Sequence, residues 1–245
     1  MTGVEVTYTF GQLEIENISL KIKYQMNKHL KRSIGFIVTL VFFISCRGQA
    51  TDSIFIKGKI WEYNCVIYST EKEVINSFPI TMEVESNLTA FLSQQTPIVY
   101  TYPYNEETIK ETTGIIEDET GISIHQPRLG DLYFTAILPM PSINYPLQNE
   151  SESQSETKIV KSSFNEINGK TIKQAKRTVG TDTISYKKEM ITCYMYEAEN
   201  LNLLGEVGKY SLKYWFNEKY GFVKYLYTKP DGSIVEINLE NIIKK

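Results

Sequence analysis

The chain has 245 residues, of which 42% are hydrophobic, and its formal net charge is −3. Removing the five basic and three acidic residues of positions 1–45 leaves 21 basic and 26 acidic residues, a net charge of −5. A mildly acidic chain is a poor candidate for nucleic-acid binding, which depends on neutralising phosphates, so we expect no nucleic-acid partner.

Residues 1–25 precede an export signal, although such signals stand at the start of a chain. Within them Val4, Val6 and Tyr8 alternate with polar residues, as in a half-buried strand. A folded strand ahead of an export signal would have to cross the membrane or remain behind. We therefore predict that Met26 is the true start and that residues 1–25 are an over-extended N-terminus.

Residues 26–45 have the pattern of a signal peptide. A basic stretch that includes Lys28, Lys31 and Arg32 precedes 11 uncharged residues, Ile34 to Ile44. A transmembrane helix needs about 20 apolar residues, so this run fits the apolar region of a signal peptide instead. The sequence therefore predicts export.

The apolar run ends in Phe43-Ile44-Ser45-Cys46, which resembles the lipobox of bacterial lipoproteins. The pattern departs from the usual one at Phe43, where Leu is typical. The resemblance implies that Cys46 is acylated and that the N-terminal lipid anchors the mature chain in the cell envelope, at the outer membrane. The alternative is an ordinary signal peptide that is cut a few residues further on, with Cys46 incidental.

The first part of the mature chain predicts short strands separated by turn residues. Ile54 to Tyr68 suits one long bent strand or two, with Gly58 at a bulge, and Phe78 to Val84 suits another. Residues 87–92 could open a short helix.

The middle of the chain predicts a hairpin, a strand and a polar loop. Residues 112–117 and 121–125 suggest a hairpin, and 132–138 suggest a further strand. Residues 148–157 carry no apolar side chain, which indicates a long flexible surface loop or a boundary between two halves.

The last third gives the clearest strand pattern. Residues 183–186 and 191–198 are strand candidates, and apolar residues alternate along 210–216, 222–227 and 235–239. A Pro-Asp-Gly turn precedes the last of these segments. Three strands joined by short loops predict an antiparallel meander with one buried face.

The predicted fold class is mostly β, an antiparallel curved sheet or open barrel with one or two short helices, in a single domain over residues 46–245. This outline is similar to the half-barrel of periplasmic lipoprotein carriers and their outer-membrane acceptors. The chain also resembles the small lipoproteins of Gram-negative bacteria. Likeness at the level of the fold does not transfer a function.

Catalytic motifs are missing from the sequence. After residue 45 His125 is the one histidine, which excludes a paired-histidine zinc motif. We predict no catalytic residue, no metal, no cofactor and no enzyme activity. His125 and Arg128 could form a patch that grips an anion, but we favour a capped strand end with Arg128 solvated. The acidic residues around Glu117 are expected to be solvated as well.

Cys65 and Cys193 remain as an even pair if Cys46 carries lipid. Both alternate with apolar residues, and an exported protein reaches an oxidising compartment, so a disulfide between them is one prediction. The alternative is that each is a separate small hydrophobic side chain in the core.

Aromatic residues crowd the segment 210–227. Tyr214, Trp215 and Phe216 are consecutive, so both faces of their strand are aromatic, and Tyr225 lies on the next strand. Core filling accounts for one face, whereas the other needs a second layer, a ligand or a partner. We name these four residues as candidate ligand-binding residues.

The expected function is a non-catalytic envelope lipoprotein that binds an apolar ligand or an envelope protein in the concave face of its sheet. The alternative is a surface glycan- or protein-binding module that uses exposed aromatic side chains. An internal apolar cavity would favour the first, and a flat row of exposed Trp and Tyr would favour the second.

Overall fold

A computed structural model describes residues 53–85, 95–147, 152–159 and 164–245. Their twelve strands form one antiparallel sheet with the order β6-β5-β4-β3-β2-β1-β12-β11-β10-β9-β8-β7. The predicted class, a mostly β protein with an open antiparallel sheet and few short helices, is confirmed. The helix expected at 87–92 and the export signal lie outside the described residues.

The elements have the following bounds. The strands are β1 (Lys59–Tyr68), β2 (Val74–Val84), β3 (Thr96–Tyr104), β4 (Glu107–Asp118), β5 (Gly121–Ile124), β6 (Ser142–Asn144), β7 (Glu152–Lys158), β8 (Thr171–Tyr186), β9 (Glu189–Asn200), β10 (Ser211–Asn217), β11 (Gly221–Thr228) and β12 (Ile234–Lys244). The helical turns are η1 (Gly130–Ile137), η2 (Asn165–Ile167) and α2 (Leu204–Val207). Within the described ranges, none of these helices has the length and apolar character to span a membrane.

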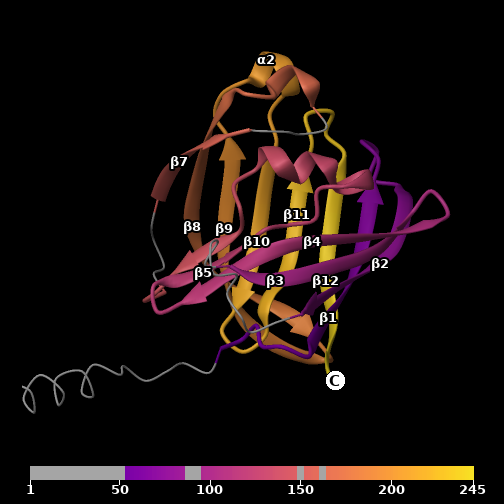
Figure 1. Ribbon diagram of the computed structural model, residues 1–245, viewed down its shortest axis with the longest axis vertical. Helices are drawn as coiled ribbons and strands as arrows, with labels where there is room; N and C mark the ends of the chain where they lie inside the picture. Colours follow the sequence, from indigo (N-terminus) through magenta and orange to yellow (C-terminus); the bar gives the residue numbers. More distant parts are fainter. Residues whose placement is uncertain (1–52, 86–94, 148–151, 160–163) are drawn as a thin grey trace, which may run out of the picture. The chain divides into compact units, whose positions relative to one another are not determined.

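The sheet folds over on itself to give two layers. Figure 1 shows β8 to β12 side by side, with β3, β4 and β5 crossing in front of them at a steep angle. The change of layer occurs at β2, which pairs with β1 along its length but with β3 only through Thr81 to Val84. The inner faces of the two layers therefore meet, as in orthogonally packed sheets.

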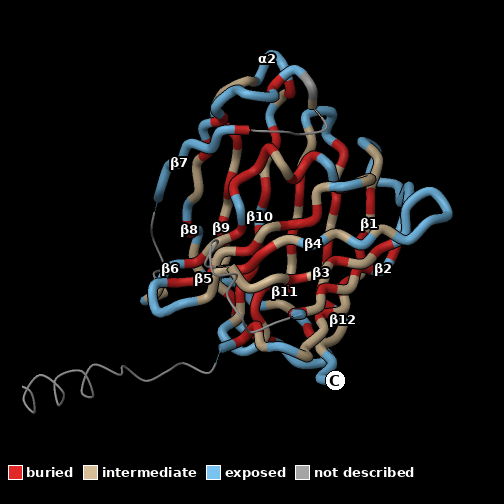
Figure 2. The backbone as a smooth tube through the Cα atoms, viewed as in Figure 1, coloured by how far each residue is buried: buried red, intermediate tan, exposed pale blue. Residues whose placement is uncertain are grey.

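Side-chain alternation places the core between the layers. Every second residue of β1 is buried from Trp61 to Ile67, and β12 follows the same pattern from Val235 to Leu239. Figure 2 shows the buried positions recurring along the strands of both layers. Because successive side chains of a strand point to opposite faces, this pattern indicates one buried face and one solvated face.

The core is rich in tyrosine, and two of the hydroxyls bond across the layers. Tyr214 donates to the carbonyl oxygen of Ser142 in β6 at 2.7 Å, and Tyr227 donates to the side-chain oxygen of Gln126, which follows β5. Buried tyrosine hydroxyls need such partners, because an unpaired one costs about 1–3 kcal/mol. The two layers are thus joined by hydrogen bonds as well as by ring packing.

The strand predicted at 132–138 is wrong, because this segment lies in the 3₁₀ helix η1. Leu132 and Phe134 alternate as in a strand, but Thr135 is buried next to Phe134 and donates to the carbonyl of Pro127 at 2.6 Å. In a 3₁₀ helix residues three apart lie on the same side, so Leu132 aligns with Thr135 and Phe134 with Ile137, and all four are buried. Strict alternation in a strand would not bury Thr135 beside Phe134.

The polar segment predicted as a loop forms an edge strand over part of its length. Residues 152–158 are β7, which pairs with β8 from Glu152↔Arg177 to Lys158↔Thr171, and all seven side chains are exposed. Residues 148–151 lie outside the described ranges. Strand pairing needs only backbone groups, so a segment without apolar residues can close the edge of a sheet, and its charges discourage further pairing.

The predicted hairpin at 112–125 and the C-terminal meander are both present. Asp118 accepts hydrogen bonds from the hydroxyl of Thr120 at 2.6 Å and from the backbone of Thr120 at 2.7 Å and Gly121 at 3.2 Å, which lower its pKa and close the β4–β5 turn. Gly121 has φ +154°, and a Cβ there would lie 2.1 Å from the carbonyl oxygen of Ile143, so only glycine fits. β10, β11 and β12 are consecutive neighbours, as expected.

We predict that alkali unfolds the protein in one cooperative step. Burial raises the pKa of Tyr63, Tyr100, Tyr214, Tyr225 and Tyr227, because it disfavours the phenolate. Stability is therefore complete below the unfolded-state tyrosine pKa of about 10 and falls as the pH rises above it. Phenolate absorbance and far-UV circular dichroism, followed together, should change in the same transition. Full ionisation of all 17 tyrosines with an unchanged dichroism spectrum would contradict this prediction.

Candidate functional site

The four aromatic residues predicted to bind a ligand are all buried, with exposed fractions between 0% and 6%. Tyr214 stacks on Tyr196 at 5.0 Å between ring centroids, and Phe216 meets Phe222 edge to face at 5.3 Å. The layer that contains β3 to β6, called the front layer below, covers Tyr214, whose hydroxyl bonds to Ser142 in β6. The layer of β8 to β12 is called the back layer. Protein therefore covers the core face of this strand, and a ligand-binding role for the four residues stays a prediction.

Trp215 lies on the opposite face of β10 from Tyr214 and is covered by charged side chains. Its indole nitrogen donates to Asp182 at 2.9 Å, and this bond lowers the pKa of the carboxyl group. The ammonium of Lys224 lies 5.3 Å from the ring centroid, a cation–π contact. Trp215, at 6% exposed, therefore offers little of its ring to a sugar.

The two cysteines are separate free thiols, so the structure does not contain the predicted disulfide. Cys65 lies on β1 and Cys193 on β9, and β12, β11 and β10 stand between them in the sheet. Four strand spacings amount to roughly 19 Å along the sheet, whereas a disulfide requires Cα atoms within about 7 Å. Matching apolar alternation could not reveal this separation.

Burial also makes both thiols unreactive. It raises the pKa of Cys65 and of Cys193 to about 12 in each case, so neither is a thiolate near neutral pH. The thiolate is the nucleophile and the metal ligand, so these side chains act as small core residues.

The structure brings His125 and Arg128 together, as the anion-patch hypothesis required. Nη2 of Arg128 lies 3.0 Å from Nδ1 of His125. Arg128 is partly buried rather than freely solvated, which differs from the interpretation we favoured. The reason is the packing of residues 125–129 along the free part of β4, through bonds to Thr113 and Glu111.

Glu117 holds the first described residues of the chain against the front layer. Its carboxylate accepts hydrogen bonds from the backbone of Ile54 at 2.7 Å and Phe55 at 3.0 Å, and from the hydroxyl of Ser53. The sequence suggested a solvated acid, because nothing local shows a partner more than 60 residues away. Among the residues with described positions, no three or more His, Cys, Asp or Glu side chains converge on a metal site.

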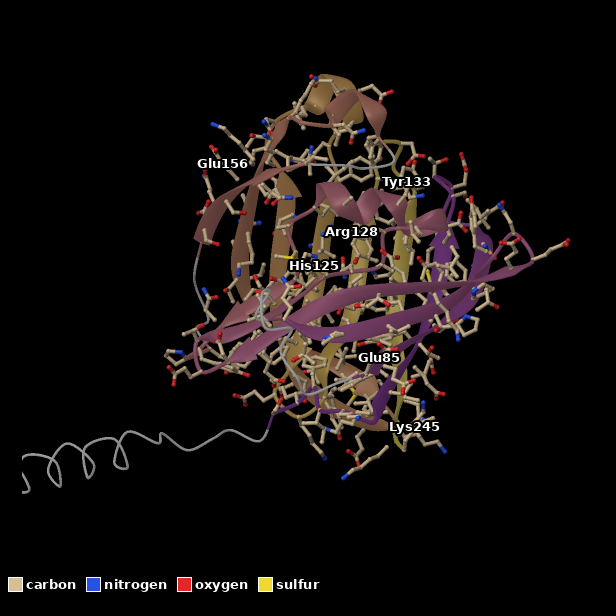
Figure 3. All side chains as sticks on the ribbon, viewed as in Figure 1. Glu85, His125, Arg128, Tyr133, Glu156 and Lys245 are labelled. Carbon is tan, nitrogen blue, oxygen red and sulfur yellow. The ribbon has the colours of Figure 1, made fainter. Side chains whose placement is uncertain are left out.

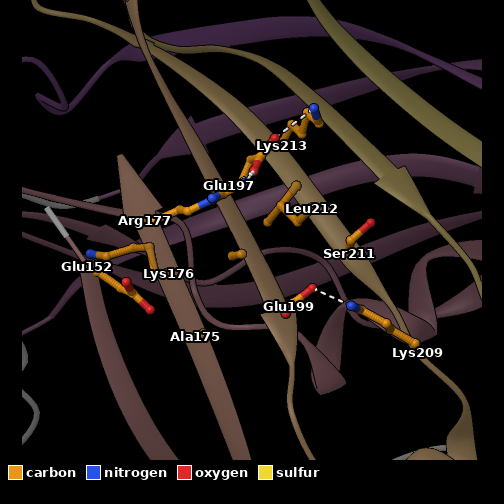
Figure 4. A pocket seen from close by; sticks show the side chains of 11 residues that line it. Glu152, Ala175, Lys176, Arg177, Glu197, Glu199, Lys209, Ser211, Leu212 and Lys213 are labelled. Carbon is orange, nitrogen blue, oxygen red and sulfur yellow. Dashed lines mark hydrogen bonds and ion pairs between the residues drawn. The ribbon is translucent and has the colours of Figure 1, made fainter. Parts of the chain in front are cut away.

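A surface groove crosses β8, β9 and β10 on the face that points away from the core (Figure 4). Its volume is about 500 Å³. The groove is lined by Glu152, Ala175, Lys176, Arg177, Glu197, Ala198, Glu199, Lys209, Ser211, Leu212 and Lys213. Charged side chains of both signs therefore dominate it.

Strand register arranges these charges in a row across the sheet. Glu197 stands opposite Arg177 on β8 and Lys213 on β10, and it pairs with them at 2.5 and 2.7 Å. Both bonds lower the pKa of Glu197, with Lys213 the larger cause. Glu199 pairs at 2.8 Å with Lys209, which precedes β10.

No local sequence pattern predicts the groove, although the charges that line it are visible in the sequence. Alternate outward positions of β9 carry Glu197 and Glu199, and those of β8 and β10 carry Arg177 and Lys213. These charges can be recognised as one row only when the strand order and register are known, because the paired side chains lie on different strands. Lys176 differs from the other cations, because its ammonium turns to Ser142 and bonds the hydroxyl at 2.7 Å.

Comparisons with known proteins show no sequence family. No family model matches the chain, and no curated protein matches it. Solved structures with a similar arrangement include a candidate exported protein with a YmcC-like fold from Bacteroides fragilis, at 14% identity and a TM-score of 0.45, covering 77% of this chain and 97% of that one. A candidate lipoprotein from Parabacteroides distasonis has 13% identity and a TM-score of 0.47, covering 77% and 96%.

The hypothetical lipoprotein YmcC from Escherichia coli is more distant, at 10% identity and a TM-score of 0.34, covering 79% of this chain and 90% of that one. Similarity at these levels transfers neither a ligand nor a role to this chain.

We predict that both thiols are free and protected in the folded protein. In a Cys46→Ser variant, a thiol reagent at about pH 8 should label nothing until the protein unfolds, because burial keeps both groups protonated. After unfolding without reductant, mass spectrometry should find two labels, and Cys65→Ala or Cys193→Ala should each remove one. Two cysteines that take up label only after reduction would show that they are joined.

Proposed function

We propose that the chain is a non-catalytic cell-envelope lipoprotein, acylated at Cys46, whose β module binds a protein partner in the outer groove of β8, β9 and β10. The signal pattern that ends at Cys46 supports the anchor. The observation that carries the binding role is the row of opposite charges across the groove.

A partner of mixed charge fits this row best. Arg177 and Lys213 flank Glu197, so a ligand of a single sign meets repulsion as well as attraction along the groove. A protein surface that carries both signs can match the row, and such matching governs partner choice and association rate. Exposed ion pairs are worth only about 0–1 kcal/mol, so they can exchange for contacts with a partner at low cost.

The inner face supports an apolar ligand less well. Its aromatic side chains already contact one another, and their hydroxyls are bonded to the opposite layer at Ser142 and Gln126. A ligand would have to displace these contacts, so we place binding at the outer groove instead of the concave face.

The anchor and the module are close in the sequence. Cys46 precedes Ser53, whose hydroxyl bonds to Glu117, by seven residues. A chain of that length spans at most about 25 Å. A lipid on Cys46 would therefore keep the module within about one domain diameter of the bilayer, where envelope proteins are its neighbours.

We predict that Cys46 carries the lipid. The chain, expressed in a Gram-negative host with a labelled fatty acid, should incorporate the label, and Cys46→Ser should lose it. Cys65→Ser is the matched control and should keep the label, because Cys65 is a buried core residue. An unlipidated wild-type protein, or a label that survives in Cys46→Ser, would contradict the anchor.

We predict that a partner contacts the groove in the envelope. A photoreactive residue at Ser211, within the groove, should give a discrete crosslinked species in the native host. The same residue at Thr183, exposed further along β8, should not. Glu197→Arg should remove the Ser211 product, because it puts three cations side by side. Equal crosslinking at both positions, or no effect of Glu197→Arg, would contradict binding in the groove.

A further inference from the structure

Residues 125–129 form a strap along the part of β4 that has no strand partner on that side. The backbone nitrogen of His125 donates to the carbonyl of Gly114 at 3.0 Å. Further along, the backbone nitrogen of Arg128 donates to both carboxylate oxygens of Glu111, at 3.0 and 2.8 Å. The strap is fixed at both ends, so the side chains of His125 and Arg128 are held beside each other (Figure 3).

The pair carries one positive charge. Nη2 of Arg128 can only donate, so Nδ1 of His125 is the acceptor at 3.0 Å, and the proton of the neutral ring is assigned to Nε2. Burial and the neighbouring guanidinium both lower the pKa of His125, which keeps the imidazole neutral near pH 7. The amide nitrogen of Gln95 lies 3.4 Å from Nε2, and because both atoms are donors in this tautomer the contact is not a hydrogen bond.

The guanidinium of Arg128 is incompletely satisfied. Its Nε is buried and has no hydrogen-bond partner among the described residues. The ion pairs formed within these residues do not include Arg128. The carboxylate of Glu111, which helps to sustain the charge of Arg128, is occupied by the strap backbone and by the hydroxyl of Tyr102 at 3.1 Å.

A buried cation with an unpaired N–H is costly. Leaving a buried donor without a partner costs about 1–3 kcal/mol, and more when the group is charged. Arginine is the side chain best suited to hold planar or tetrahedral oxyanions, because its N–H groups form a rigid fork. An anion at Nε would satisfy the donor and neutralise the charge together.

We infer that Arg128, supported by His125, is a binding site for an oxyanion, either a free ion or the carboxylate, phosphate or sulfate group of a larger ligand. The neutral His125 orients the guanidinium by accepting from Nη2, and Nε–H is the donor that remains for the anion. This site is separate from the groove of β8, β9 and β10, and it does not depend on acylation of Cys46.

The test is a titration of the purified full chain, followed through the Arg128 Nε–H signal in nuclear magnetic resonance. Inorganic phosphate, sulfate, acetate and glucuronate are the probes, at constant ionic strength, with chloride as the reference anion. At least one oxyanion should shift the signal saturably where chloride does not. A response to glucuronate but not acetate would identify a sugar acid, and a response to phosphate or sulfate alone would identify a tetrahedral anion.

Substitutions distinguish a specific anion site at Arg128 from nonspecific electrostatic attraction of anions to the protein. Arg128→Gln should weaken binding of the responding anion at least about tenfold, because it removes a charged hydrogen bond. Arg128→Lys keeps the charge but loses the fork of N–H groups, so its affinity for the anion should lie between those of the wild type and Arg128→Gln. Arg177→Gln, which alters an arginine paired with Glu197 on the surface, is the matched control and should bind like the wild type.

Two results would overturn the inference. The first is a wild-type Nε–H signal that no oxyanion shifts more than chloride does, which needs no variant to fold. The second is equal weakening by Arg177→Gln and Arg128→Gln.

Discussion

Tyrosine hydroxyls in the interior constrain the whole architecture. A sheet face built from tyrosine buries large rings, but each hydroxyl must find a partner in the same dry space. Here the partners of Tyr214 and Tyr227 belong to segments that follow β5, namely Ser142 and Gln126. Tyr63 bonds instead to the carbonyl of Phe222 at 3.1 Å. The front layer therefore lies where it supplies hydrogen-bond acceptors to the buried tyrosine hydroxyls of the back layer.

As a result, the charged groups that could contact a ligand lie outside the aromatic core. The inner faces are taken up by ring contacts, and the thiols of Cys65 and Cys193 are held protonated within the core. Charged side chains gather on the outward face of β8, β9 and β10, and Arg128 lies on a strap where pairing with β5 has ended. Both proposed binding regions thus lie where the sheet exposes charge or leaves a donor unpaired.

The sequence predicted the elements whose patterns are local and missed those that depend on distant partners. The meander of β10 to β12 alternates cleanly, and the β4–β5 turn carries its own capping acid, Asp118. The alternation of Leu132 and Phe134 predicts a strand, but these residues lie within the 3₁₀ helix η1. The separation of Cys65 from Cys193, the clamp by Glu117 and the charged groove all follow from strand order, which periodicity does not contain.

The front layer, rather than a ligand, covers the aromatic face of the back layer. A double-mutant cycle on Tyr227 and Gln126 tests this arrangement most directly, with the free energy of unfolding measured for Tyr227→Phe, Gln126→Leu and the double variant. If the layers meet as described, the double variant loses less stability than the two single variants combined, with a coupling of about 0.5–3 kcal/mol. Additive losses, equal within about 0.5 kcal/mol, would show that the two side chains do not meet and would contradict the account.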